Sequence, residues 1–177
     1  MARRKPHPPR LPSSSSRRTR GCDYCDAQMG DARNTDRLWP ILRHATKLHV
    51  LIYRATRGRI GHRFRGGPPM LLLDHVGART AVRRTTPLVY VRDGENVVII
   101  ASKGGHPRHP AWFHNLKANP DASIQIGATR HVVRARVADP PERARLWPKA
   151  VEIYPGYEGY QERTAREIPL VILEPRR

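Results

Sequence analysis

A segment suited to binding an anion stands near the middle of the chain, where Ala101-Ser102-Lys103-Gly104-Gly105 follows an apolar run and leads toward a short helical pattern. Two adjacent glycines let the backbone come close to a ligand. Main-chain amides at a helix start favour an anion, and Lys103 and Ser102 add a charge and a hydroxyl. The spacing differs from the phosphate loop GxxxxGK[ST]. Ligand contact and a plain strand-to-helix turn both remain open from this segment alone.

A second candidate anion site is a loop rich in arginine. Arg79, Arg83 and Arg84 fall within six residues, between Gly77 and the strand-like run that begins at Thr85. Guanidinium groups on adjacent elements bind phosphate or carboxylate in a bidentate manner. The alternative is a solvated basic loop without a ligand.

Three tyrosines near the C-terminus, Tyr154, Tyr157 and Tyr160, recur at every third position, although the whole chain holds only six. This spacing places the rings on one side of a turn or short helix. A phenol can donate a proton or hydrogen-bond a carbonyl oxygen. Aromatic packing against a core is the alternative explanation.

Histidine and cysteine are the other residues that could hold a metal or a redox centre. His106 and His109 each precede proline, which favours extended backbone, and His114 has no set of carboxylates on one helix face. Cys22 and Cys25 have CxxC spacing, but a second such pair is missing and no strand precedes them. We therefore expect surface imidazoles, chance thiols and no metal site.

The elements that must position these residues are mostly short strands. A helical apolar period that starts at Asp36 as N-cap, with Gly58 beyond its end, predicts an N-terminal helix. The period then changes to two, and Asp93-Gly94 is a hairpin signal. The expected strands are Met70–Val76, Thr85–Arg92, Asn96–Ala101, Ala122–Gly127, Val132–Val137 and Ile168–Leu173. The expected later helices are Pro110–Ala118 and Pro140–Tyr154.

Short strands joined largely by hairpins, with helices at one end and in one crossover, predict a mainly β, α+β fold built on a small antiparallel barrel. Residues 35–177 are expected to form this domain. Residues 1–34 are expected to be a disordered basic tail, because the first twenty residues hold seven Lys and Arg, four prolines and no acid. A translation start at Met29 would make that tail an artefact.

The charge of the chain points to an anionic partner. Residues 36–177 carry 25 Lys and Arg against 12 Asp and Glu, and the whole chain has a formal charge of +18. Nucleic acid, an acidic membrane face or a polyanionic ligand would satisfy this excess. The polar face of the first helix, with Arg37, Arg43, His44 and Lys47, could touch anionic lipid. Since no run of 18 apolar residues is present, we expect no transmembrane helix.

Several motifs, taken in order, make the chain similar to a known family. They are ASKGG from Ala101, HPAW from His109, NLKANP from Asn115 and YPGY from Tyr154, flanked by the segments Tyr53–Gly61, Arg84–Leu88 and Ile168–Pro175. Over residues 37–175 the sequence resembles the deazaflavin-dependent nitroreductase family of split β-barrel proteins. No single motif is specific, but their ordered combination is.

The resemblance implies a reductase that uses coenzyme F420, an 8-hydroxy-5-deazaflavin whose carbon 5 passes a hydride to a quinone, nitroaromatic or conjugated enone. The coenzyme carries a phosphate and an oligoglutamate tail, which agrees with the basic loops. At the coenzyme the resemblance places Arg79, Arg84, Thr85, Thr86, Pro87, Ala101, Ser102, Lys103, Gly104, Gly105, Ala111 and Trp112. It places Tyr154, Tyr157 and Tyr160 on the substrate side, where one of them, or Ser102, would donate the proton that follows the hydride.

The chain departs from the family pattern at a few positions. Arg79 and Ala81 stand where the family motif GRKTG has lysine and its second glycine, so the geometry of this loop is open. Val89 stands where some members have a substrate-facing tyrosine, and His114 where an apolar residue is commoner. Activity on nitro compounds is therefore less firmly implied than coenzyme binding.

Four partner and location expectations follow. They are a small-molecule acceptor, no specific nucleic acid, a monomer or homodimer, and a cytoplasmic location with peripheral association with an anionic membrane at its inner face as an open option. The rival functions are a basic nucleic-acid-binding protein, a flavin mononucleotide or haem protein on the same barrel, and a deazaflavin-binding protein without turnover. The few aromatic residues, 6% of the chain, disfavour base stacking.

Overall fold

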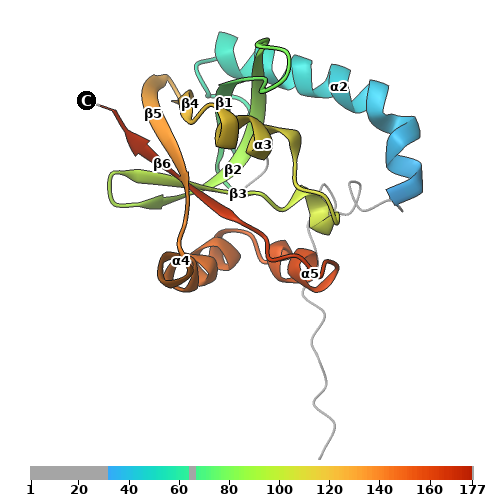
Figure 1. Cartoon of the computed structure of the whole chain (residues 1–177). Coiled ribbons are helices and arrows are strands. Elements are labelled where there is room, and N and C mark those ends of the chain that lie inside the picture. Colours follow the sequence, from blue (N-terminus) through green and yellow to red (C-terminus); the bar gives the residue numbers. More distant parts are fainter. Residues whose placement is uncertain (1–31, 64–66, 177) are drawn as a thin grey trace, which may run out of the picture.

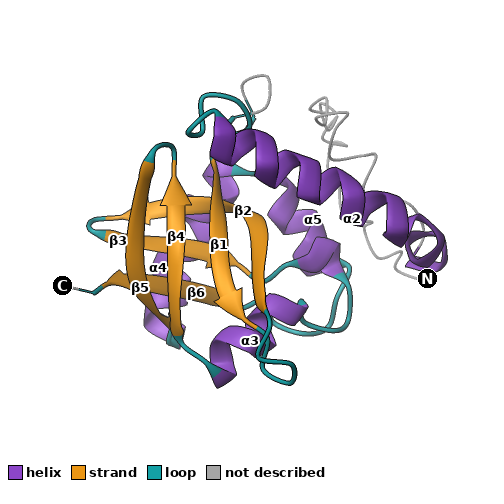
Figure 2. Cartoon of the chain, turned by 90° about the horizontal axis from the view of Figure 1, so that it is seen from above, coloured by secondary structure: helices purple, strands orange, loops and turns teal. Residues whose placement is uncertain are grey.

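A closed antiparallel barrel of six strands forms the centre of the computed structural model, which describes residues 32–63 and 67–176. The strands follow the spatial order β1-β2-β3-β6-β5-β4 (Figures 1 and 2). Their bounds are β1 (Met70–Val76), β2 (Arg83–Asp93), β3 (Asn96–Ile100), β4 (Asp121–Ile126), β5 (Thr129–Val137) and β6 (Leu170–Pro175). Each neighbouring pair is antiparallel. The prediction of a small antiparallel β-barrel is confirmed.

Helices cover two sides of the barrel and one of its ends. Figure 1 shows the long helix α2 (Ala32–Ala55) on one side, and α4 (Pro140–Ile153) with α5 (Gly156–Glu162) on the opposite side. The helix α3 (Ala111–Ala118) and the short 3-10 turn η1 (Lys103–Gly105) lie in the connection between β3 and β4. The core therefore has two parts, one inside the barrel and one between its outer surface and α4 and α5.

The alternating pattern of the strands separates these two parts. Val97 and Ile99 of β3 belong to the cluster inside the barrel, whereas Val98 and Ile100 belong to the cluster under α4 and α5. Successive side chains of a strand point to opposite faces, so a continuous apolar run means that both faces are covered. Leu71 and Leu73 likewise face the barrel interior.

The end of α2 is fixed to the barrel by Tyr53, which is fully buried. Its hydroxyl donates to the carbonyl oxygen of Met70 at 3.1 Å and accepts from the N–H of Gly127 at 2.9 Å. Gly58 lies so close to Gly127 that an added methyl group would stand 2.5 Å from the Cα of Gly127. The last turn of α2 thus touches both β1 and the turn after β4.

Most expected elements are found, with ends that shift by up to three residues. The expected N-cap at Asp36 is wrong, because α2 begins at Ala32 and Asp36 lies inside it. Since no glycine or proline separates Ala32 from Asp36, nothing in the sequence stops the helix there. Tyr157 and Tyr160 lie in a short helix, α5, one of the two expected forms of the tyrosine segment, whereas Tyr154 is the C-cap of α4. Cys22, Cys25 and Met29 lie outside the described residues, as does the rest of the segment 1–31.

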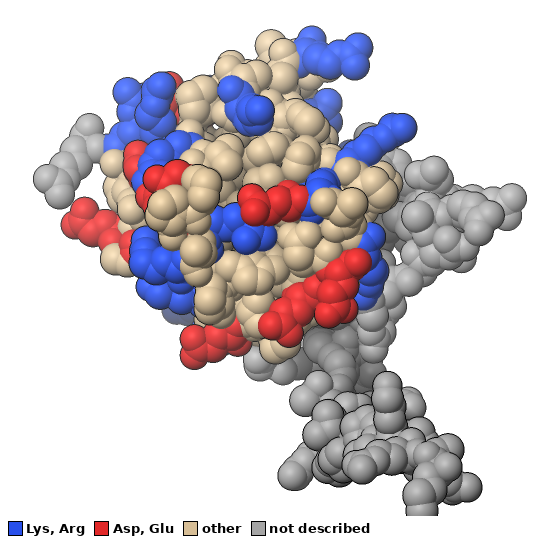
Figure 3. All heavy atoms as spheres, turned by 60° about the horizontal axis from the view of Figure 1, so that its bottom comes forward, with Lys and Arg blue, Asp and Glu red and all other residues tan. Residues whose placement is uncertain are grey.

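Charges on the face with α4 and α5 are mixed, as Figure 3 shows. Arg145 and Lys149 of α4 both contact Asp93, and Arg136 contacts Glu142. Much of the basic excess on this side of the described chain is therefore neutralised locally. Within the described ranges, every helix is too short or too polar to cross a lipid bilayer.

Candidate active site

The segment Ser102–Gly105 turns sharply after β3 and packs against α5. A methyl group placed on Gly105, whose φ is +79°, would stand 2.7 Å from the carbonyl oxygen of Tyr160, so only glycine permits this approach. Figure 1 shows the yellow-green turn beside α5. The fold thus brings the anion-type segment to the tyrosine segment, although the two lie far apart in the sequence.

The backbone angles of this turn are of the kind that binds anions. Ser102 has right-handed helical angles, and Lys103 and Gly104 follow with φ of 48° and 64°. Such a succession points neighbouring N–H groups into one concavity that favours anions. A side chain added at Gly104 would meet nothing within 4 Å, and the Lys103 side chain is exposed. The segment can therefore offer amides and a cation to one ligand.

Arg166, which lies between α5 and β6, holds this turn from behind. Its guanidinium donates to the carbonyl oxygens of Ala101, Ser102 and His106 at 3.1, 2.8 and 2.9 Å. It also donates to Nδ1 of His109 at 3.1 Å, so that ring carries its proton on Nε2. Burial and then the charge of Arg166 lower the pKa of His109. One side chain thus fixes three carbonyls around the turn. The N–H groups of Gly105 and His106 donate to the carbonyl oxygens of Ser102 and Lys103, which leaves the amides of Ser102–Gly104 for a ligand.

The arginine loop between β1 and β2 is attached to α3. The Asn115 side-chain oxygen accepts from the N–H of Ala78 at 3.0 Å, and Figure 2 shows this loop beside α3. Arg79 and Arg84 are exposed, and in the described part of the chain neither forms an ion pair. The loop therefore carries two exposed cations without an ion pair near the start of β2.

The first residues of β2 are tied to β1 by their hydroxyl groups. Thr85 donates to Asp74, whose carboxylate also accepts from Arg54 of α2 at 2.6 Å. Thr86 lies 3.1 Å from Nε2 of the buried His75. Pro87 follows in the strand and is half-buried, opposite Leu72. These contacts fix the strand that carries Arg84 and the predicted coenzyme residues after it.

Two predicted coenzyme residues start α3 and differ in exposure. Ala111 is exposed, whereas Trp112 is 6% exposed and its ring packs inside the barrel. The Trp112 ring lies edge-on to Phe113 at 6.3 Å between centroids. The indole therefore belongs to the core inside the barrel, and Ala111 stands at the surface beside it in the sequence.

The three tyrosines form one aromatic group between α4, α5 and the outer barrel surface. Their ring centroids are 5.0 to 6.1 Å apart, and the hydroxyls of Tyr154 and Tyr160 lie 3.1 Å from one another. Tyr157 and Tyr160 are buried, and Tyr154 is half-buried. The three tyrosines thus pack against one another, and two of them also pair their hydroxyl groups. Tyr160 lies next to the turn at Gly105.

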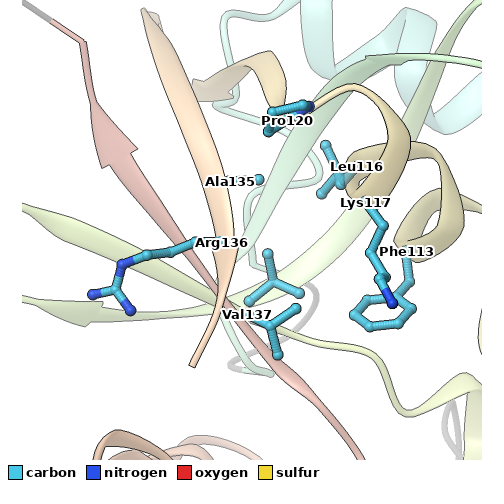
Figure 4. Close-up of a pocket in the computed structure, with 8 residues that line it drawn as sticks. Phe113, Leu116, Lys117, Pro120, Ala135, Arg136 and Val137 are labelled. Atoms are coloured by element: carbon cyan, nitrogen blue, oxygen red, sulfur yellow. The ribbon is translucent and has the colours of Figure 1, made fainter. Parts of the chain in front are cut away.

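The hollow drawn in Figure 4 lies apart from these residues. It has a volume of about 200 Å³ and is lined by Phe113, Leu116, Lys117, Pro120, Ala135, Arg136, Val137 and Val171. Sites for drug-sized ligands usually measure about 300–1,000 Å³. This hollow contains none of the predicted coenzyme residues, and it is small for a deazaflavin with a charged tail.

Comparison with known proteins decides the family. The family model described as F420H(2)-dependent quinone reductase matches residues 45–175. The chain belongs to the F420H(2)-dependent quinone reductase family. It is therefore an oxidoreductase that depends on coenzyme F420, and the predicted cofactor is confirmed at the level of the family.

Relatives of this quinone reductase family agree in sequence and in fold. An F420H(2)-dependent quinone reductase of Mycobacterium tuberculosis is 53% identical over 133 residues, which cover 73% of this chain and 89% of that protein. A solved F420-H2-dependent reductase, FDR-A, is 41% identical with a TM-score of 0.57, covering 60% of this chain and 94% of that one. Another solved chain, described as a domain-swapped dimer, is 37% identical with a TM-score of 0.60, covering 76% and 98%.

The described residues fit the coenzyme of the quinone reductase family. A phosphate and several glutamates need cations and N–H donors, and Arg79, Arg84 and Lys103 supply unpaired cations at the surface. The open concavity at Ser102–Gly104 supplies main-chain donors. A site for a polyanion is thus consistent with both loops.

Sequence reasoning missed the residues that hold this site from behind. Arg166 lies in a stretch without a recognisable period, and its partners are distant in sequence. Asp74 and His75 interrupt the apolar run of β1. Because polar side chains in a buried strand need hydrogen-bond partners, this interruption indicates that other segments supply such partners. Asn115 lies in the segment NLKANP, whose sequence does not indicate a role for its side chain.

Proposed function

We propose that this protein reduces a quinone with a hydride from reduced F420, and that nitroaromatics and conjugated enones are further acceptors. When bound, the reduced coenzyme supplies a hydride at carbon 5. The observation that carries the proposal is the placement of a cation-bearing amide turn, Ser102–Gly105, directly against the tyrosine helix. The residues that bind the coenzyme and the residues that supply the proton would then lie next to one another.

The coenzyme side of the proposal is electrostatic. Arg79 and Arg84 would hold the phosphate and glutamates, with Lys103 and the amides of the turn as further donors. Thr85, Thr86, Pro87 and Ala101 would form the backbone surface along which the coenzyme lies, together with Ala111 at the start of α3. Because the Trp112 ring is buried in the core, we propose that only its main chain faces the coenzyme.

The acceptor side of the proposal rests on hydroxyl groups. The hydroxyls of Tyr154 and Tyr160 share one hydrogen bond, and either phenol could donate a proton to an acceptor oxygen. Ser102 stands at the start of the neighbouring turn as the alternative donor. Tyr157 would contribute by packing against both tyrosines and excluding water.

Charge reversal tests the coenzyme site. The variants Arg79→Glu and Arg84→Glu should raise the KM for reduced F420 at least tenfold, because each replaces an attraction to the tail with a repulsion. They should leave binding of the deazariboflavin chromophore, which lacks phosphate and glutamates, nearly unchanged. Arg130→Glu, at an exposed position in β5, is the matched control. Unaltered F420 affinity in both site variants would overturn the assignment of this loop.

Turnover tests the acceptor side and the rival functions. Reduced F420 and menadione should give steady turnover, which separates a reductase from a protein that only binds the deazaflavin. Phe variants of the tyrosines and Ser102→Ala should lower kcat in at least one case; full turnover in all of them would remove the proposed proton donors. Titration with flavin mononucleotide, followed by absorbance, tests that rival. DNA binding that vanishes at modest salt would reflect charge alone.

The cellular setting is proposed on the surface of α2. Leu48, Leu51 and Ile52 are 57, 65 and 37% exposed, and Lys47 lies beside them, which suits peripheral contact with an anionic membrane from the cytoplasm. Sedimentation with anionic vesicles tests this, and Leu51→Glu should abolish it. The proposed site residues all come from one chain, so a monomer would suffice for catalysis, and a homodimer is compatible.

A further inference from the structure

His75 is a buried polar residue beside the proposed coenzyme loop, and the reaction does not use it. It is 4% exposed and sits near the end of β1. Its Nδ1 lies 3.1 Å from Nδ2 of Asn115, and its Nε2 lies 3.1 Å from Oγ1 of Thr86. One ring thus joins α3, which holds the arginine loop, to the start of β2.

The contacts of Asn115 determine where the His75 proton resides. The Asn115 oxygen accepts from the N–H of Ala78, so its NH₂ group is the end that faces His75. An NH₂ group only donates, and Nδ1 must therefore be unprotonated. The proton of the neutral ring is then on Nε2, which donates to the Thr86 oxygen. The Thr86 hydroxyl hydrogen is left to point elsewhere.

We propose that His75 is a positioning residue for coenzyme binding: its neutral, Nε2-protonated ring holds the Ala78 amide through Asn115 and leaves the Thr86 hydroxyl as a donor toward the coenzyme. The statement about the coenzyme rests on the proposed function, because it requires that this loop and strand bind it. The arrangement of the ring does not depend on that requirement.

Acid should undo this arrangement. A proton on Nδ1 would face the Asn115 NH₂ group, donor against donor, and that contact would break. Among the described residues, the charges acting on His75 are Arg84 from β2, which opposes protonation, and Asp74 from β1, which favours it; α3 presents neutral Asn115. Asp74 is itself paired with Arg54 of α2. Burial, followed by Arg84, lowers the pKa of His75 below its usual value, so the neutral form prevails at pH 7.

The first experiment needs no variant and no coenzyme. Nitrogen NMR of the imidazoles of the wild-type protein should show Nδ1 of His75 as the unprotonated nitrogen at pH 7, with protonation only below pH 6.5. The Ala78 amide should exchange with solvent faster as that protonation occurs. A protonated Nδ1 at pH 7 would overturn the proposal, and so would an Ala78 amide indifferent to the titration.

The second experiment measures KM for reduced F420 between pH 5 and 7. In the wild type it should rise about tenfold once His75 is protonated, with little change in kcat, because the loop binds but does not react. His75→Gln keeps an acceptor and a donor without titrating, so its KM should be flat with pH, whatever its value at pH 7. His131→Gln, at an exposed position in β5, should behave as the wild type. Equal profiles for wild type and His75→Gln would overturn the proposal.

A third variant covers the case in which His75→Gln fails to fold. Asn115→Asp keeps the acceptor for Ala78 but replaces the donor with a carboxylate oxygen, so it should raise the pKa of His75. Because protonated Nδ1 would then donate to that oxygen, the acid-induced exchange of the Ala78 amide should disappear. An unmoved pKa would contradict the contact. If the NMR results hold while Arg79→Glu and Arg84→Glu leave F420 affinity intact, the loop assignment fails and the histidine arrangement stands.

Discussion

The guanidinium of Arg166 donates to the carbonyl oxygen of Ser102 at 2.8 Å, from a position between α5 and β6. The same group reaches the carbonyl oxygens of Ala101 and His106. A planar guanidinium has five donors in a fixed fork, which lysine cannot reproduce. The shape of the proposed coenzyme turn therefore depends on a residue that need not touch the coenzyme.

Replacing Arg166 should loosen this turn. Arg166→Met removes the side-chain donor of the Ala101 and His106 carbonyls, whereas the Ser102 carbonyl still accepts from the N–H of Gly105. Each carbonyl left unpaired and kept from water costs about 1–3 kcal/mol. We expect a loss of about 2–4 kcal/mol in the free energy of unfolding in urea, and a higher KM for reduced F420. Arg166→Lys, which restores one donor, should fall between this variant and the wild type. Arg130→Met is the exposed control, and a loss as large as that of Arg166→Met would count against the clamp.

Replacing Ala81 with glycine should stabilise the protein. Its φ is 53°, in the left-handed region, and its N–H donates to the carbonyl oxygen of Gly77 at 2.9 Å. The left-handed region costs a non-glycine residue about 1–2 kcal/mol, and part of the relief is offset by chain entropy. Ala81→Gly should thus raise the free energy of unfolding by about 0.5–1 kcal/mol. Ala128→Gly, at a turn position whose own φ is not positive, should lower the free energy of unfolding. A loss in both variants would show that Ala81 carries no strain.

Gly58 and Gly94 form a matched pair that separates contact from backbone strain. Both have positive φ, +77° and +63°, but an added methyl group meets Gly127 at 2.5 Å in the first case and nothing within 4 Å in the second. Gly94→Ala should cost about 1–2 kcal/mol from backbone strain alone. Gly58→Ala should cost clearly more, because backbone must move. Equal losses in thermal unfolding would contradict the close approach of α2 to the barrel.

Acid stability should depend on Asp93. Hydrogen bonds from Arg145, at 2.6 and 2.8 Å, and then from Lys149 hold the pKa of this carboxyl well below its usual range. Because the folded pKa is depressed, the stabilisation is complete above the unfolded pKa near 4 and is lost as the pH falls below it.

Urea unfolding at pH 7 and at pH 3 measures this effect. Asp93→Asn should be less stable than the wild type at pH 7, and the gap should narrow at pH 3. Asp121→Asn, whose carboxylate is about half exposed, should show a smaller gap at pH 7. A gap for Asp93→Asn that stays constant with pH would contradict the ion-pair explanation.

The barrel could be predicted because its signals are local. Asp93-Gly94 fixes one hairpin, and the two faces of β3 are both apolar because both are covered. The start of α2 was missed because capping is a weak signal in a polar stretch without glycine or proline. The roles of Arg166 and His75 depend on partners far along the chain, which no spacing reveals.

The site was predictable in part, for the same reason. The turn at Lys103 and Gly104 and the tyrosine spacing are short-range patterns, and the fold places them together. The absence of a described ion pair at Arg79 and Arg84 could not be predicted from the sequence. Which acidic side chains come close to an arginine at the surface depends on the tertiary structure. That these loops bind the coenzyme remains a prediction.

The hydroxyl of Tyr53 bridges β1 and the turn after β4, where the barrel closes. β1 and β4 are paired over only three positions, and the two groups bonded by this hydroxyl, the Met70 carbonyl and the Gly127 amide, belong to β1 and to the turn after β4. The end of α2 therefore stabilises the closure of the barrel. A variant shortened from the N-terminus must therefore keep the segment from Tyr53 to Gly58. Without it, β1 and β4 are expected to separate, because they are paired over only three positions.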